Sequence, residues 1–289
     1  MSDYVIFSDS TTDLPPALIE ELGIKVLPLT FLIDNKSYKN YPDNRDLPIE
    51  DFYTKIRAGI PSKTVQISPT DFEEAFEAVL KEGKDVLYIA FSSGLSGTYQ
   101  SSEIAAKDLK DKYPNNKIIV VDSLAASMGE GLLVYFAVQQ KQNGLTIDEL
   151  EKWLYANRNH LAHWFTVDDL HHLKRGGRVS AAAAVFGSAL NIKPLLHVDN
   201  EGHLIPVKKV RGRKQSLDGL AEKLFETVLP DCKTFFISHG DSLADAKFVE
   251  KLIKTKIPDS KVYISHIGPV IGSHSGPGTI ALFFLATAK

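Results

Sequence analysis

The chain has 289 residues, 44% of them hydrophobic, which is enough for one large or two ordinary domains with a sizeable core. Its formal net charge of -3 disfavours a protein whose main partner is nucleic acid, and a single cysteine, Cys232, excludes an internal disulfide and a thiolate metal cage. The sequence has neither a long apolar run nor a signal-peptide pattern, so we expect a cytoplasmic protein.

The first half of the chain alternates strand-like and helix-like segments. Strands are expected at 4–9, 25–34, 85–91 and 117–123, and helices at 14–23, 70–83, 98–113, 125–143 and 146–161. Thr70 to Glu73 has capping-box spacing, Gly23 is placed to end the first helix, and 35–48 is expected to be a long loop. This alternation predicts a mostly parallel sheet flanked by helices.

The pattern changes near residue 160, so we place a boundary between an N-terminal α/β domain, 1–160, and a mixed α/β domain, 161–289. The second half has a small-residue helix expected at 179–196 and a hairpin signal at 199–202. It ends with a strand, a helix and a strand at 233–268, a glycine-rich loop, and an apolar run at 279–286.

The segment FSSGLSG, 91–97, follows a buried-type strand and precedes a helix start. Three interpretations stay open from these residues alone. The loop could cradle an anionic oxygen on backbone N–H groups and hydroxyls, cap the helix without further function, or carry a catalytic serine at Ser96. The last interpretation is weakened because the second glycine of the serine elbow is displaced and no base can be assigned from chain order.

Other polar stretches are less specific. His274 lies between two serines on the glycine-rich loop, which favours a positioned side chain. Asp9 to Asp13 is expected to make loop and capping hydrogen bonds. Two basic stretches, 172–180 and 207–214, suit a solvated face, a protein partner or a phosphate-bearing ligand. No dedicated metal-ligand spacing is present, although His239, Asp241 and His266, together with Asp9 or Asp122, could assemble a metal site.

Taken together, these stretches resemble the DegV family of bacterial lipid-binding proteins. The segments that carry the resemblance occur in the family's order from end to end: DSTTDLP, SKTVQISPTDFEEAF, FSSGLSGTYQSS, LHHLKRGGRVS, GSALNIKPLL, VRGRK and IGPVIGSHSGPGTIAL. The resemblance implies two α/β domains with a long-chain fatty acid held in a buried apolar tunnel between them. It further implies a carrier without catalysis or cofactor of its own, which presents the fatty acid carboxylate to a fatty acid kinase for acyl phosphate formation and phospholipid synthesis.

The resemblance also assigns roles to residues. Ligand binding is expected at Thr64, Ser92, Ser93, Gly94, His274, Ser275, Gly276 and Arg211, with Ser93 preferred to Ser96 as the serine that touches the carboxylate. Contact with the kinase is expected at Arg175 and Arg178. Val65 stands where the family often has a hydroxyl, and His171 and His172 replace more usual residues, so details of the polar network depart from the family pattern.

The family resemblance further suggests transient membrane contact for lipid exchange, and no nucleic-acid partner. Two alternatives remain at this point: a serine- or metal-dependent hydrolase of lipid esters, and a regulatory or nucleic-acid-binding protein that uses the basic stretch at 207–214.

Overall fold

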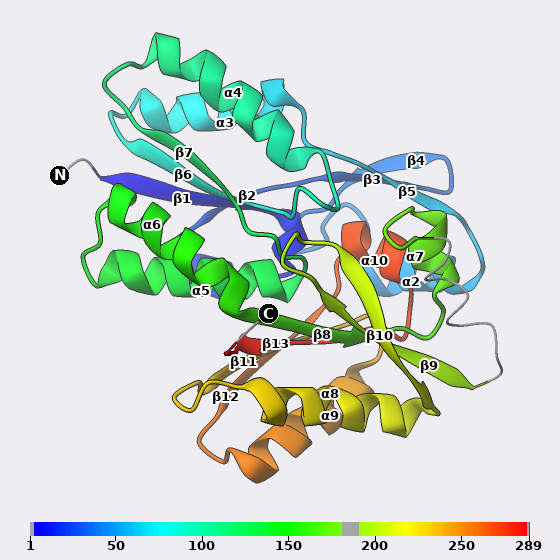
Figure 1. Cartoon of the computed structure of the whole chain (residues 1–289). Helices are drawn as coiled ribbons and strands as arrows, with labels where there is room; N and C mark the ends of the chain where they lie inside the picture. The colour runs from blue at the N-terminus through cyan, green and yellow to red at the C-terminus, as the bar shows by residue number, and fades with distance from the viewer. Residues whose placement is uncertain (1–2, 181–190, 288) are drawn as a thin grey trace.

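The computed structural model describes residues 3–180, 191–287 and 289. In these ranges the strands form a parallel sheet, a small antiparallel sheet and a mixed sheet. In Figure 1, helices α3 (Pro69–Leu80) and α4 (Thr98–Lys112) cover the outer face of the parallel sheet, and α8 (Arg213–Thr227) and α9 (Leu243–Lys256) cover the outer face of the mixed sheet. Between the two sheets lies α5 (Met128–Gln142), which packs against strands of both. The α/β class expected from the sequence is confirmed.

Each sheet has a simple strand order. The parallel sheet has the order β2 (Lys25–Leu27), β1 (Tyr4–Asp9), β6 (Asp85–Ala90) and β7 (Ile118–Asp122). The small sheet has the order β4 (Lys36–Lys39), β3 (Thr30–Ile33) and β5 (Ser62–Val65). The mixed sheet has the order β10 (Leu204–Arg211), β9 (Ile192–Val198), β8 (Leu161–Thr166), β13 (Ile280–Leu285), β11 (Thr234–His239) and β12 (Lys261–His266).

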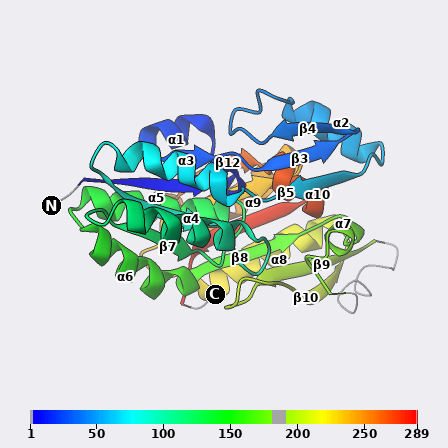
Figure 2. The same ribbon diagram turned by 90° about the horizontal axis from the view of Figure 1, so that it is seen from above.

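The remaining helices are short or lie at the edges. They are α1 (Pro16–Leu22), α2 (Ile49–Arg57), α6 (Ile147–Asn157), α7 (His171–Arg175), α10 (Pro269–Ser275) and the 3₁₀ turns η1 (Ser10–Thr12) and η2 (Arg158–His160). Figure 2 shows α10, α7 and β5 together at one end of the molecule, where α10 contacts both. None of the helices within the described ranges is long and apolar enough to cross a membrane.

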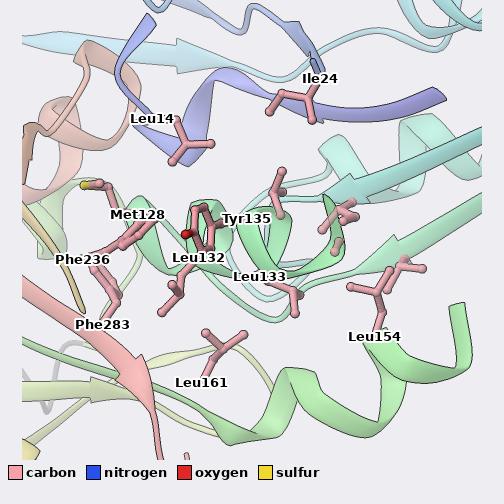
Figure 3. Packing of buried hydrophobic residues seen from close by; sticks show 14 of the residues in the cluster. Leu14, Ile24, Met128, Leu132, Leu133, Tyr135, Leu154, Leu161, Phe236 and Phe283 are labelled. Atoms are coloured by element: carbon pink, nitrogen blue, oxygen red, sulfur yellow. The ribbon is translucent and has the colours of Figure 1, made fainter. Parts of the chain in front are cut away.

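The main hydrophobic cluster joins the two halves of the chain. Figure 3 shows Leu14 on one side of α5, with Phe236 and Phe283 from the mixed sheet on the other. The Tyr135 ring on α5 lies edge-on to Phe236, with 5.6 Å between centroids. Among the described residues, the strands of the first two sheets precede residue 160 and those of the mixed sheet follow it. The boundary at 160 stays a prediction, because this cluster is continuous across it.

Several sequence expectations differ from the structure. The apolar run 25–34 is two strands in two sheets, since Pro28 cannot donate to a ladder and the chain turns there. The expected loop 35–48 contains β4, which pairs with β3 as a hairpin. The capping box of α3 uses Ser68 and Asp71, two residues earlier than the Thr70 pattern suggested.

Two further differences lie in the second half. The glycine-rich segment after β12 contains the helix α10, which starts at Pro269 because the fixed φ of proline suits a first helical position. The small-residue helix expected at 179–196 is wrong at its end, since 192–196 pairs with β10 as part of β9, and its centre, 181–190, lies outside the described residues. The hairpin at 199–202 is confirmed.

Candidate ligand site

A cavity lies between the inner face of the mixed sheet and the segment directly before α5, and it reaches β5, α10 and the loop after β6. The volume that the centre of a water molecule can occupy inside this cavity is about 170 Å³. One water needs about 10–15 Å³ on that measure, so there is room for on the order of ten water-sized groups. Most of its wall is apolar and comes from both halves of the chain, including Leu29, Phe91, Leu95, Phe165, Ile267 and Phe283.

The polar end of the cavity is built on a contact between Thr64 and His274. Thr64 lies on β5, and His274 lies in the last turn of α10, which packs against that strand. The Thr64 Oγ1 and His274 Nε2 atoms are 2.8 Å apart, a hydrogen bond across 210 positions of sequence. Val65, the next residue on β5, is 47% exposed because side chains alternate along a strand. Its departure from the family pattern therefore leaves the cavity wall unaffected.

The His274 imidazole is held neutral and close to a turn. Burial, and then the neighbouring charge of Arg178, lower the His274 pKa to about 4. Gly176 lies directly against the ring, since a Cβ atom at that position would be 2.2 Å from His274 Nδ1. At neutral pH the ring can therefore offer one hydrogen-bond donor and one acceptor without adding charge.

Arg178 supplies the positive charge at this end. The segment after α7 carries it, and its Nε donates to the Leu95 carbonyl oxygen at 3.2 Å while a terminal nitrogen donates to the Gly176 carbonyl oxygen. Burial lowers the pKa of the guanidinium, which nevertheless stays charged as arginine does in proteins. A carboxylate beside Thr64 and His274 would thus meet a cation that is already fixed by two backbone carbonyls.

The segment FSSGLSG contributes its second half to the cavity. Ser96 and Gly97 line it, directly before α4 starts at Thr98. The Ser96 Oγ accepts from the Thr98 backbone N–H at 3.2 Å and lies 2.9 Å from the Thr98 hydroxyl. Gln66 lies against Gly97, where a Cβ atom would be 2.2 Å from the amide oxygen.

Residues 92–94 of that segment face elsewhere. Ser92 is fully buried and donates through Oγ to the Gly202 carbonyl oxygen at 2.9 Å, while the Ser93 backbone N–H donates to Asp122 at 3.2 Å. Ser92, Ser93 and Gly94 are absent from the residues that line the cavity. The geometry therefore favours Ser96 over the expected Ser93, because the chain turns back after Ser92 and brings Leu95, Ser96 and Gly97, besides Phe91, to the wall.

Of the other residues that the resemblance assigned to the site, some line the cavity and others do not. Ser275 lines the cavity, whereas Gly276 follows α10 in the left-handed region and does not. Arg211 ends β10 in an exposed position away from the wall, and Arg175 is exposed with a terminal nitrogen 2.9 Å from His172 Nδ1. Arg178, expected to face a partner, lies at the cavity itself.

A second hollow lies on the outer side of the polar end. Its lining includes Thr64, Arg178 and His274, which it shares with the cavity, together with Lys63, His172 and Arg175. Three side chains thus stand between an apolar interior and a basic surface groove. A group bound by them would have one side on the cavity and the other toward the groove.

Sequence reasoning missed four polar residues of the cavity wall, Gln66, Ser127, His163 and Thr279. Each lies on or beside a strand or helix, and none belongs to a motif that would indicate a ligand-binding role. His163 is the third residue of a largely apolar strand, LAHWFT, and alternation alone would have placed it on the same face as Phe165.

The chemistry needed for a hydrolase is incomplete here. Thr64 and His274 form a hydroxyl and imidazole pair, but within the described ranges no hydrogen bond joins His274 to a carboxylate that could orient it. Across those same ranges, no group of three or more His, Cys, Asp or Glu side chains could hold a metal ion. The arrangement is that of a small-molecule binding site with an apolar interior and a few polar groups at its mouth.

Comparison with known proteins identifies the family. A family model described as "Uncharacterised protein, DegV family" matches residues 3–287, so the chain belongs to the DegV family. A DegV domain-containing protein from Clostridium perfringens is 47% identical over 100% of this chain and 99% of its own length.

Solved structures extend the comparison. A DegV lipid-binding protein from Thermotoga maritima superposes with a TM-score of 0.83 at 32% identity and covers 99% of both chains. A DegV family protein from Thermus thermophilus, described as binding fatty acid, gives a TM-score of 0.86 at 30% identity and covers 99% of this chain and 100% of its own.

Proposed function

We propose that this protein binds a long-chain fatty acid with the tail in the internal cavity and the carboxylate at Thr64, Ser96, Arg178 and His274. The observation that carries the proposal is the position of Thr64, Arg178 and His274 between the apolar cavity and the surface groove. The fatty-acid binding described for relatives at 28–32% identity supports the ligand class.

The two ends of such a ligand would contribute differently. Each buried methylene adds about 0.8 kcal/mol of transfer free energy, so a long tail supplies most of the affinity before the costs of ordering are subtracted. The carboxylate would receive hydrogen bonds from hydroxyls and an imidazole, with one fixed guanidinium nearby. The head therefore fixes orientation and the tail fixes affinity.

We further propose that the protein is a cytoplasmic carrier rather than an enzyme, and that a fatty acid kinase phosphorylates the carboxylate through the groove. Lys63, His172 and Arg175 on the groove fit an approaching nucleotide or an acidic protein surface. Lipid exchange with a membrane would load the carrier, and the acyl phosphate would enter phospholipid synthesis.

The ligand class is tested by extracting the purified protein with organic solvent and identifying the extract by mass spectrometry. A stoichiometric long-chain fatty acid is expected, together with no turnover of simple acyl esters. Ester hydrolysis by the wild-type protein that His274→Ala abolishes would instead support a hydrolase.

The site is tested with Thr64→Ala and His274→Ala in an acyl phosphate assay with a fatty acid kinase. Removing a hydrogen bond to a charged group costs about 1.5–3 kcal/mol, so each variant is expected to lower fatty-acid affinity by about tenfold or more. Val65→Ala, the neighbouring change on the exposed face of β5, is the matched control. Unchanged acyl phosphate formation in both site variants would contradict the assignment.

A further inference from the structure

The cavity has a second polar feature on the mixed sheet. His163 lies on β8 directly opposite Phe283 of β13, and both side chains line the cavity. Three residues along the ladder from this pair, Thr166 is opposite Ile280, close to where Thr279 and α10 build the polar end. At about 3.3 Å per residue, His163 is thus about 10 Å along β8 from that pair.

The His163 ring has no hydrogen-bond partner among the described residues. The side chain is 1% exposed, and both Nδ1 and Nε2 are buried without a partner. Its surroundings hold it there: the Phe283 ring is edge-on at 5.3 Å, and a Cβ atom on Gly129 would be 2.4 Å from His163 Cε1. Cε1 and Nε2 both lie against Gly129 on α5, so Nδ1 is the ring nitrogen left for a partner. Because buried polar groups are nearly always paired, it indicates a partner that the protein itself does not supply.

The neighbouring wall offers little to a water molecule. A buried water usually makes about two to four hydrogen bonds. On the same faces of β8 and β13 the wall is formed by Phe165, Ala281 and Phe283, and the Ser127 hydroxyl already contacts Asp13 and Ser238. A hydroxyl carried by the ligand suits Nδ1 better, because it can accept from the Nδ1–H of one tautomer or donate to Nδ1 in the other, and its carbon chain fills the apolar surroundings.

We propose that the cavity is adapted to a long-chain fatty acid that carries a hydroxyl group in the middle of its chain, and that His163 is the residue that recognises this hydroxyl. The inference rests on the proposed function and names a subclass of its ligand. His163 acts as a specificity-determining residue, distant from the carboxylate end.

The test compares octadecanoic acid with its monohydroxy derivatives, with the hydroxyl in the first third, the middle and the last third of the chain. The measured quantity is the affinity for each hydroxy acid divided by the affinity for octadecanoic acid. His163→Leu is expected to lower this ratio by about tenfold for the middle position and little for the others. His163→Gln keeps a donor and an acceptor and is expected to retain most of the ratio.

His197→Leu is the matched control. His197 Nδ1 is also buried without a partner, but the ring lies on the neighbouring strand β9, stacks on Trp164 at 5.0 Å and is not part of the cavity wall. In protein with ¹⁵N-labelled histidine, the mid-chain hydroxy acid should shift the His163 ring nitrogens and octadecanoic acid should not.

The outcomes separate the two proposals. If no fatty acid binds to the wild-type protein, the proposed function fails. If octadecanoic acid binds and the ratio is the same in wild type and His163→Leu, this inference alone is overturned, as it is if a bound water satisfies His163 in the octadecanoic acid complex.

Discussion

At the scale of single residues, the site depends on where small residues let polar side chains approach. Gly176 leaves room for the His274 ring, which in turn meets Thr64 across the cavity mouth. A side chain at 176 would displace His274, because the ring nitrogen lies well inside contact distance of the missing Cβ atom. Gly176 in KRGGRVS therefore matters for the site as much as the arginines beside it.

Substitutions of Ser96 and Ser93 are expected to have different effects on fatty-acid affinity. Ser96 lines the cavity and Ser93 does not, so Ser96→Ala is expected to lower fatty-acid affinity by about tenfold and Ser93→Ala by less than about twofold. Isothermal titration with one fatty acid on both variants measures the difference. The opposite order of effects would restore Ser93 as the ligand contact.

At the scale of elements, a buried polar network fixes β1 to α5. Glu130 on α5 is fully buried, with Oε1 2.9 Å from the Ser8 hydroxyl and Oε2 2.7 Å from the Thr11 hydroxyl. The same hydroxyls also contact the Ile89 carbonyl oxygen and Asp9, so two hydroxyl protons face four acceptors. Burial, and then the nearby charge of Asp9, raise the Glu130 pKa well above its usual range. A proton on Glu130 supplies one of the two missing donors.

Glu130→Gln is therefore expected to change the free energy of unfolding by less than about 1 kcal/mol, since an amide reproduces the donor and acceptor of a neutral carboxyl. Glu130→Ala leaves Ser8 and Thr11 short of partners beside a void, and is expected to cost about 3 kcal/mol or more. Urea unfolding at pH 7 measures both. A glutamine variant as unstable as the alanine variant would show that the group is ionised.

At the scale of the whole molecule, a few buried hydrogen bonds hold the two halves of the chain together around the cavity. Asp13, after η1, accepts from the Gly268 backbone N–H at 2.8 Å and from the Ser127 hydroxyl. Tyr53 donates to the Ile267 carbonyl oxygen at 2.8 Å, and Ser92 contacts Gly202. These contacts hold the segments before α10 and after β9 in place. They therefore also fix the position of the polar end of the cavity.

Asp13 makes stability depend on pH. Burial raises its pKa from 3.8 to about 7, so between these values the folded state binds more protons than the unfolded state and stability falls as pH rises. Asp13→Asn removes this dependence and keeps an acceptor for Gly268. Relative to wild type, the variant is expected to gain about 2–3 kcal/mol between pH 5 and pH 8, at about 1.4 kcal/mol per pH unit up to pH 7.

Urea unfolding at the two pH values gives the comparison. His239 and His274, whose pKa values burial lowers to about 4, act in the opposite direction by losing stability as pH falls, but they contribute equally to both proteins. Asp111→Asn at an exposed site is the control. A difference between Asp13→Asn and wild type that stays constant with pH would contradict the role given to burial.

Much of the fold follows from local pattern. Alternating apolar runs with helix signals predicted the parallel sheet, and Gly23 and the hairpin at 199–202 ended and turned elements where expected, since their residues determine backbone conformation locally. The division of 25–34 between two sheets and the helix in the glycine-rich segment were missed. Both depend on which strands and helices the segment meets, as α10 does with β5 and α7.

By itself, the sequence determined the α/β class, the membership of the family that its ordered motifs resemble, and the prominence of Thr64 and His274. Only the tertiary structure decided that those two side chains touch, that Ser96 rather than Ser93 lies on the cavity wall, and that His163 lines the cavity without a hydrogen-bond partner. The reason is physical: hydrogen-bond partners 210 positions apart and the burial of a ring are properties of packing, which residue types and spacing constrain but do not specify.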